Sequence, residues 1–136
     1  GFTDKQTNAI IAYFSALDNV PPTFTSISEK QPSAESLAAG TRLASRDYFS
    51  CSSCHFQGGK TPTSPPTQWA PDLAKSKQRI RYEFIPEWVK DPQKFTPGVG
   101  MPGFLPSDDA APPDILNGNR QKQADALRDF VFSLSP

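Results

Sequence analysis

Both cysteines and the only histidine of this 136-residue chain lie together in the sequence CSSCH, at residues 51–55. The pattern is compatible with a redox-active dithiol, a zinc site, or the covalent attachment of a cofactor. A structural zinc site usually takes four ligands from two separated pairs, whereas Cys54 and His55 are neighbours here. A thioredoxin-like dithiol would follow a strand in a βαβ unit, which the sequence does not indicate, and would leave His55 without a role.

Covalent attachment of haem c is the chemistry that uses the whole motif. Two thiols three positions apart add to the two vinyl groups of a haem, and a histidine directly after the second thiol reaches the iron from one face. We therefore expect one haem c, bound through Cys51 and Cys54, with His55 as an iron ligand. A bound cofactor also suits a chain with 15 prolines, because such a chain has difficulty filling a core from its own side chains.

Few residues of the chain could serve as the second axial ligand of the iron. No other histidine exists, which excludes two histidine ligands from this chain, and the single methionine, Met101, lies in the sequence PGVGMPGF. Such a methionine often fills a gap in a core, but a loop rich in Pro and Gly is also suited to hold a ligand. We expect Met101 to be the second iron ligand, with lysine, water or an open position as alternatives, and this ligation implies a raised potential.

Helices must position these residues, because the sequence contains no convincing strand. The predicted fold class is all-α. Residues 56–71 and 95–106 are too rich in Pro and Gly for regular structure. Helices are predicted over residues 3–17, from Ser33 to the neighbourhood of CSSCH, over 75–82, after Ile85 with Pro86 at the first helical position and an end at Asp91-Pro92, and after Asn119.

The first helix repeats features of the last one. Two amphipathic helices always share a period of about 3.6 residues, which explains matching apolar positions but not a matching Lys-Gln pair. We therefore expect residues 1–20 to form a helix that ends a preceding domain, residues 21–32 a linker, and residues 33–136 a further domain. One shift places Lys5-Gln6 on Lys122-Gln123, Ala9 on Ala126, Ile10 on Leu127, Tyr13 on Phe130 and Leu17 on Leu134.

Charge and hydropathy exclude several partner classes. Fourteen basic residues balance fourteen acidic ones, so nothing points to nucleic acid or an anionic membrane surface. No stretch approaches the run of about 18 to 20 apolar residues that crosses a bilayer. The start GFTDKQ has no signal-peptide features and no initiator methionine, so we expect a processed or excised piece.

Residues 33–136 resemble the class I c-type cytochromes, in particular bacterial, monohaem, His/Met-ligated domains. The resemblance implies the cytochrome c fold, in which an N-terminal and a C-terminal helix cross, here at Gly40 and Phe130, and the haem lies in a loop-rich pocket. The longer spacing from Gly40 to Cys51 and the sequence SDDAAPPDILNGN, which looks like an insertion, depart from the family pattern. The matching sequences are CSSCH at 51–55, Pro71-Asp72-Leu73, WVKDP at 88–92 and GMPGF at 100–104.

The same resemblance implies roles for residues around the haem. The carbonyl of Pro71 would accept the second N–H of His55 and fix its tautomer. Trp88 would lie by a haem propionate. Arg79 and Arg81 are candidates to neutralise the propionates, although ordinary solvated helix charges explain them equally well.

The resemblance implies an electron carrier rather than an enzyme, cycling between Fe(II) and Fe(III) with redox proteins as donor and acceptor. The compartment would be periplasmic or exported, with any membrane association through parts outside this chain. One alternative is a haem domain of a larger multidomain redox enzyme or multihaem cytochrome, to which a preceding haem domain in the same polypeptide would belong. Another is an enzyme or sensor with an open iron position in place of Met101.

Overall fold

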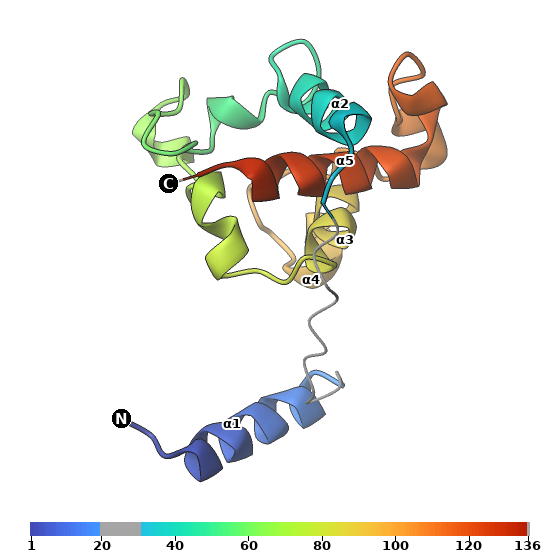
Figure 1. Ribbon diagram of the computed structural model, residues 1–136. Coiled ribbons are helices and arrows are strands. Elements are labelled where there is room, and N and C mark those ends of the chain that lie inside the picture. Colours follow the sequence, from blue (N-terminus) through green and yellow to red (C-terminus); the bar gives the residue numbers. More distant parts are fainter. Residues whose placement is uncertain (20–30, 136) are drawn as a thin grey trace.

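The computed structural model describes residues 1–19 and 31–135, so most of the predicted linker over residues 21–32 lies outside the described residues. The described residues form no β-strand, only isolated bridges. The prediction of an all-α fold is therefore confirmed (Figure 1). The helices are α1 (Asp4–Leu17), α2 (Ala34–Ala44), α3 (Phe84–Lys90), α4 (Pro92–Phe95) and α5 (Arg120–Ser133), and short 3-10 turns lie in the loops.

The three longer helices begin at polar residues that cap them. Thr3 and Gln6 form a capping box at the start of α1, in which each side chain bonds the backbone of the other residue. The Ser33 and Asn119 side chains each accept a backbone N–H three residues later, at the starts of α2 and α5. These caps satisfy N–H groups that have no partner inside the helix, and they agree with the starts predicted from the sequence.

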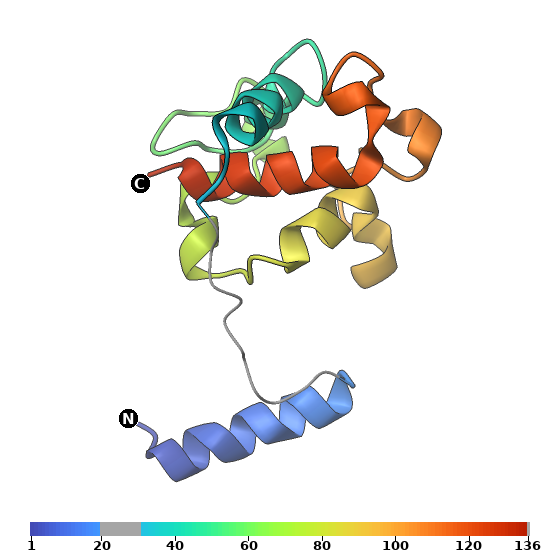
Figure 2. The same ribbon diagram turned by 45° about the vertical axis from the view of Figure 1, so that its right-hand side comes forward.

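Helices α2 and α5 cross in close contact at Gly40 (Figure 1). A Cβ atom at Gly40 would overlap the carbonyl oxygen of Ala126 and lie 2.8 Å from the Cβ of Phe130. The two helix backbones can therefore approach only because residue 40 has no side chain. Helix α3 packs against another side of α5, as the turned view shows (Figure 2).

The segment that looked like an insertion, residues 107–119, is part of the core. Its Ala111 and Ile115 are buried, with 6% and 3% of their surface exposed. Gln123, which is fully buried on α5, donates from Nε2 to the carbonyl oxygens of Pro112 and Ile115, both at 2.7 Å. This segment therefore closes one end of the α2–α5 pair rather than forming a surface appendage.

Several helix boundaries differ from the predicted ones. Helix α2 ends at Ala44, well before CSSCH, because Ser45 is extended with ψ 171°. The helix predicted over 75–82 is instead a 3-10 helix, η3 (Leu73–Gln78), which begins earlier because the Asp72 side chain caps it. Helix α3 begins at Phe84, so Pro86 is its third residue rather than its first. Pro92 not only follows the end of α3 but also begins α4, since a proline needs no N–H partner there.

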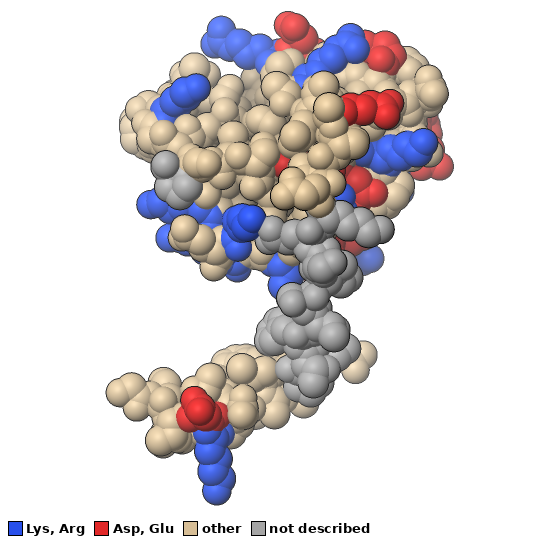
Figure 3. Space-filling model, viewed as in Figure 1, with Lys and Arg blue, Asp and Glu red and all other residues tan. Residues whose placement is uncertain are grey.

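Helix α1 leaves its apolar side uncovered among the described residues. Tyr13, Phe14 and Leu17 are 65%, 55% and 67% exposed, and both ribbon views place α1 away from the other helices (Figures 1 and 2). In the space-filling view most of α1 is uncharged, whereas basic and acidic side chains are interspersed over the remaining surface (Figure 3). No helix among the described residues combines the length and apolar composition that a membrane crossing requires.

Candidate functional site

The CSSCH segment folds into a single tight helical turn. Cys51 begins the 3-10 helix η1 (Cys51–Ser53), directly after Ser50, whose φ of 51° reverses the chain. The N–H of His55 donates to the Cys51 carbonyl at 2.9 Å. Residues three apart in a 3-10 turn lie on the same side, so Cys54 shares a side with Cys51. Both cysteines are free and partly buried.

A backbone contact sets the orientation of the His55 ring. The Nδ1 atom lies 2.8 Å from the Pro71 carbonyl oxygen, and because that oxygen can only accept, Nδ1 carries the proton. This hydrogen bond leaves Nε2, the other ring nitrogen, as the atom that could bind a metal. Two further bonds hold Pro71 in place: the Ala70 N–H donates to the Cys54 carbonyl at 2.8 Å, and the Leu73 N–H donates to the Phe56 carbonyl at 2.9 Å.

Asp72, next to Pro71, ties this loop together. One of its carboxylate oxygens accepts the N–H groups of Gly58 and Ala74, both at 3.0 Å. These hydrogen bonds, with the one from Gly58 the strongest influence, lower the pKa of Asp72 below its ordinary value. Asp72 therefore connects the residues after CSSCH to the start of η3, with the His55 acceptor between them.

The two rejected chemistries of CSSCH can be compared with this geometry. Burial is the main reason that the pKa of Cys51 is raised to about 11. A redox-active dithiol needs the opposite, a thiol whose pKa is lowered. The described residues also contain no group of three or more His, Cys, Asp or Glu side chains that could hold a metal ion.

Met101 lies in a loop that is packed onto α3 and α4. The Phe104 N–H donates to the Val89 carbonyl at 3.0 Å, and a Cβ atom at Gly103 would lie 2.8 Å from the Lys90 carbonyl oxygen. Gln93 adds a side-chain bridge, because its Oε1 accepts the Gly98 N–H at 2.8 Å. The loop is therefore fixed on both sides of Met101.

The segments around CSSCH and Met101 come together in space. The rings of Phe49 and Phe104 lie 4.9 Å apart, centre to centre, with an angle of 31° between their planes. Cys51 and Met101 both pack against the same cluster of buried apolar residues. The Cys51 thiol and the Met101 thioether therefore lie against one core. Together with Cys54 and His55, which belong to the same turn as Cys51, they are the donor types of a His/Met-ligated haem c.

Of the predicted propionate contacts, Trp88 lies beside Met101 and Arg79 lies at the end of η3. Trp88, on α3, donates its indole N–H to the Met101 sulfur at 3.0 Å, a contact for which the sequence spacing gave no signal. Arg79 is exposed at the end of η3, with its backbone N–H on the Ser76 carbonyl. Propionate contacts of Trp88 and Arg79 stay predictions.

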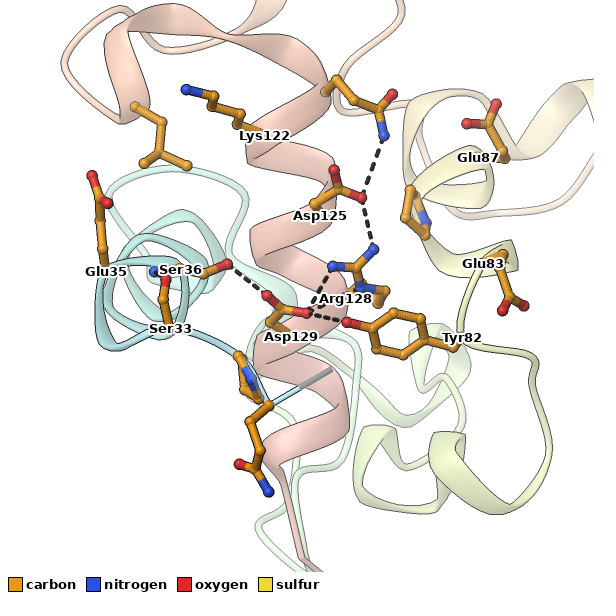
Figure 4. Close-up of a pocket in the computed structure, with 15 residues that line it drawn as sticks. Ser33, Glu35, Ser36, Tyr82, Glu83, Glu87, Lys122, Asp125, Arg128 and Asp129 are labelled. Carbon is orange, nitrogen blue, oxygen red and sulfur yellow. Dashed lines mark hydrogen bonds and ion pairs between the residues drawn. The ribbon is translucent and has the colours of Figure 1, made fainter. Parts of the chain in front are cut away.

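A separate cavity of about 660 Å³ lies between α2, α3 and α5 (Figure 4), and none of the predicted site residues lines it. Its central carboxylate, Asp129, is 6% exposed and accepts hydrogen bonds from Ser36 at 2.6 Å and Tyr82 at 2.9 Å. Arg128 pairs with Asp129 at 2.9 Å and with Asp125 at 2.8 Å. Arg128 offsets one of the two carboxylate charges, and the contacts of Asp129 join α2, α5 and the turn at Tyr82 that precedes α3.

Comparisons with known proteins add no relationship. No protein-family model, curated protein or solved structure matches this chain. The features of this chain that bear on function are therefore CSSCH, the hydrogen bond between His55 and Pro71, and the placement of Met101.

Proposed function

We propose that residues 33–136 form a class I c-type cytochrome domain that carries electrons through one covalently bound haem c. The observation that carries this proposal is the CSSCH turn, with two free thiols and a histidine whose Nδ1 is occupied by the Pro71 carbonyl. When bound, the haem supplies one-electron exchange between Fe(II) and Fe(III). The crossing of α2 and α5 at Gly40 supports the cytochrome c fold within the all-α class.

Each donor has a separate task in this proposal. The Cys51 and Cys54 thiols would add to the two vinyl groups, with each S–H hydrogen going to a vinyl carbon, so that no external oxidant is consumed. His55 would bind the iron through Nε2, and its hydrogen bond to Pro71 would keep the ring from turning and increase its donor strength. Met101 would supply the soft, neutral ligand on the other side, which favours reduced iron.

The surroundings of Met101 favour an electron carrier over an open-site haem enzyme or sensor. The hydrogen-bond partner that the described residues give its sulfur is the Trp88 indole. An indole N–H donates and cannot accept a proton. Peroxidase-type chemistry needs a proton acceptor beside the open iron position. A donor that holds a thioether in place instead suits an iron that exchanges only electrons.

Helix α1 favours a second context, in which this domain belongs to a larger multidomain redox enzyme or multihaem cytochrome. Tyr13 is 65% exposed on α1, whereas its counterpart Phe130 on α5 is 8% exposed, against α2. Helix α1 carries the same pattern of apolar residues as α5, but these residues are exposed. A preceding domain with its own α2-like helix would explain this difference. The site chemistry is unchanged in that context.

The proposed setting follows from how this cofactor is attached. Addition of haem to a CxxCH motif takes place outside the cytoplasm, so we place the protein in the periplasm or among exported proteins. Its partners would be a redox protein that donates electrons and another that accepts them, each docking through a small, weak interface.

Expression with and without a c-type haem maturation system tests the proposal. The denatured chain should gain the mass of one haem only when the maturation system is present, and its two cysteines should then resist alkylation. The alkaline pyridine spectrum should be that of a haem with two thioether links. A chain that remains free of haem, with two alkylated cysteines, would refute the proposed function.

A further inference from the structure

The Met101 sulfur has a specific hydrogen-bond donor. The Trp88 Nε1–H lies 3.0 Å from Sδ, and both side chains are half-buried. A thioether sulfur has two lone pairs, and an indole has one N–H and no acceptor. The sulfur therefore uses one lone pair for Trp88 and keeps the other available.

Trp88 is itself held in place by aromatic neighbours. Its ring centre lies 5.6 Å from that of Phe84 and 6.1 Å from that of Phe95. The next two residues of the same helix, Val89 and Lys90, contact the Met101 loop through their carbonyl groups. The donor, Trp88, and the acceptor, Met101, therefore lie on two segments whose backbones pack against each other. This packing holds the two side chains close together.

We infer that Trp88 is a positioning residue for the second iron ligand, and that its N–H on the Met101 sulfur raises the reduction potential of the haem. This inference rests on the proposed function. The hydrogen bond leaves the second lone pair of the sulfur available, and in the haem-loaded protein that lone pair would bind the iron. The same bond would withdraw electron density from the sulfur, which would disfavour Fe(III) relative to Fe(II) and so favour the reduced state.

The inference competes with a placement of Trp88 beside a haem propionate. The single indole N–H cannot serve the sulfur and a carboxylate fully at the same time. Loss of a propionate donor would leave the bond between iron and sulfur unchanged, and its effect on the potential would vary as the propionate titrates. Loss of a sulfur donor would instead change the iron–sulfur bond at every pH.

Replacement of the N–H alone gives the sharpest test. The chain has two tryptophans, so the Trp69→Phe variant leaves Trp88 as the sole site for benzothienylalanine, which has the shape of tryptophan with sulfur in place of N–H. The control is the Trp69→Phe variant with ordinary tryptophan at position 88. Both proteins then lack the Trp69 N–H and its bond to the Ser64 carbonyl, so they differ only in the N–H of residue 88. Packing against Phe84 and Phe95 is preserved in the comparison.

In the haem-loaded protein, we expect the analogue to move the sulfur-to-iron absorption band and lower the potential, relative to Trp69→Phe. Since one hydrogen bond contributes about 0.5–1.5 kcal/mol, the equilibrium constant for reduction of the iron should fall about two- to thirteenfold. An unmoved band, or a potential change that vanishes at some pH, would overturn the inference and leave the proposed function intact. Absence of the band from the unmodified protein would overturn both the inference and Met101 ligation.

Discussion

The two segments that carry the proposed iron ligands are held by different forces. CSSCH forms a turn that its own backbone closes, because the His55 N–H bonds the Cys51 carbonyl. The neighbouring loop adds the contacts of Ala70 with Cys54 and of Pro71 with His55. Met101 instead depends on the close contact of Gly103 with Lys90 and on the Trp88 N–H. The first segment is therefore an anchor held by its own turn and one loop, and the second carries a proposed exchangeable ligand that α3 and its neighbouring residues position.

Of the changes considered, removal of both thiols should have the largest effect, because it removes the covalent attachment of the haem. We expect Cys51→Ala with Cys54→Ala to abolish covalent haem completely, because no other thiol exists in the chain. Ser52→Ala, within the same turn, should retain one haem per chain, because it keeps both thiols and their spacing. Haem that stays with the denatured double variant, measured by intact mass, would contradict the anchoring role.

Removal of the exchangeable ligand should leave the anchor intact. We expect Met101→Ala to keep its covalent haem while the reduction potential falls, on the order of 100 mV or more, within the range of about 0.8 V that axial ligands span. The opened iron should bind imidazole or carbon monoxide. Redox titration and ligand titration measure the two effects. A potential equal to that of the unmodified protein would show that Met101 is not a ligand.

The loop that holds Met101 should be sensitive to its backbone contact with α3. A methyl group at position 103 would lie 2.8 Å from the Lys90 carbonyl oxygen, whereas one at position 100 would meet nothing within 4 Å. We expect Gly103→Ala to cost about 1–3 kcal/mol of unfolding free energy, and Gly100→Ala to change it by about 0.5 kcal/mol or less. Denaturant unfolding measures both. Equal stabilities of the two variants would argue against the close contact.

In the loop that supports CSSCH, Asp72 should make the unfolding free energy depend slightly on pH in the acidic range. Its pKa is lowered by the Gly58 and Ala74 N–H groups, so its contribution is present above the ordinary carboxyl pKa of about 3.9 and is lost as the pH falls through the lower folded value. Unfolding free energy should therefore decrease less between neutral pH and about pH 3 in Asp72→Asn than in the unmodified chain. Asp108→Asn, at an exposed carboxylate, is the control. Parallel pH curves for all three proteins would refute this role.

The sequence predicted features that depend on neighbours along the chain. The caps at Thr3, Ser33 and Asn119 and the all-α class are of this kind, since each follows from residues within one turn. The expected contact between Pro71 and His55 is also present in the structure.

Contacts between distant segments were expected only where the family resemblance implied them, as for the crossing at Gly40 and Phe130; the others could not be predicted. Residues 107–119 looked like an insertion because their Pro and Asp content indicates loop, but Ala111 and Ile115 fill the core beside α5. The hydrogen bond from Trp88 to Met101 joins a helix to a loop, and no periodicity relates the two positions.

The absorption spectrum of the ferric, haem-loaded protein reports both ligand segments at once. We expect low-spin iron with the weak sulfur-to-iron band at the red end of the spectrum, which requires both His55 and Met101 as ligands. A high-spin spectrum without this band would show that CSSCH holds a haem that GMPGF does not ligate, and ligation by both segments would then be wrong.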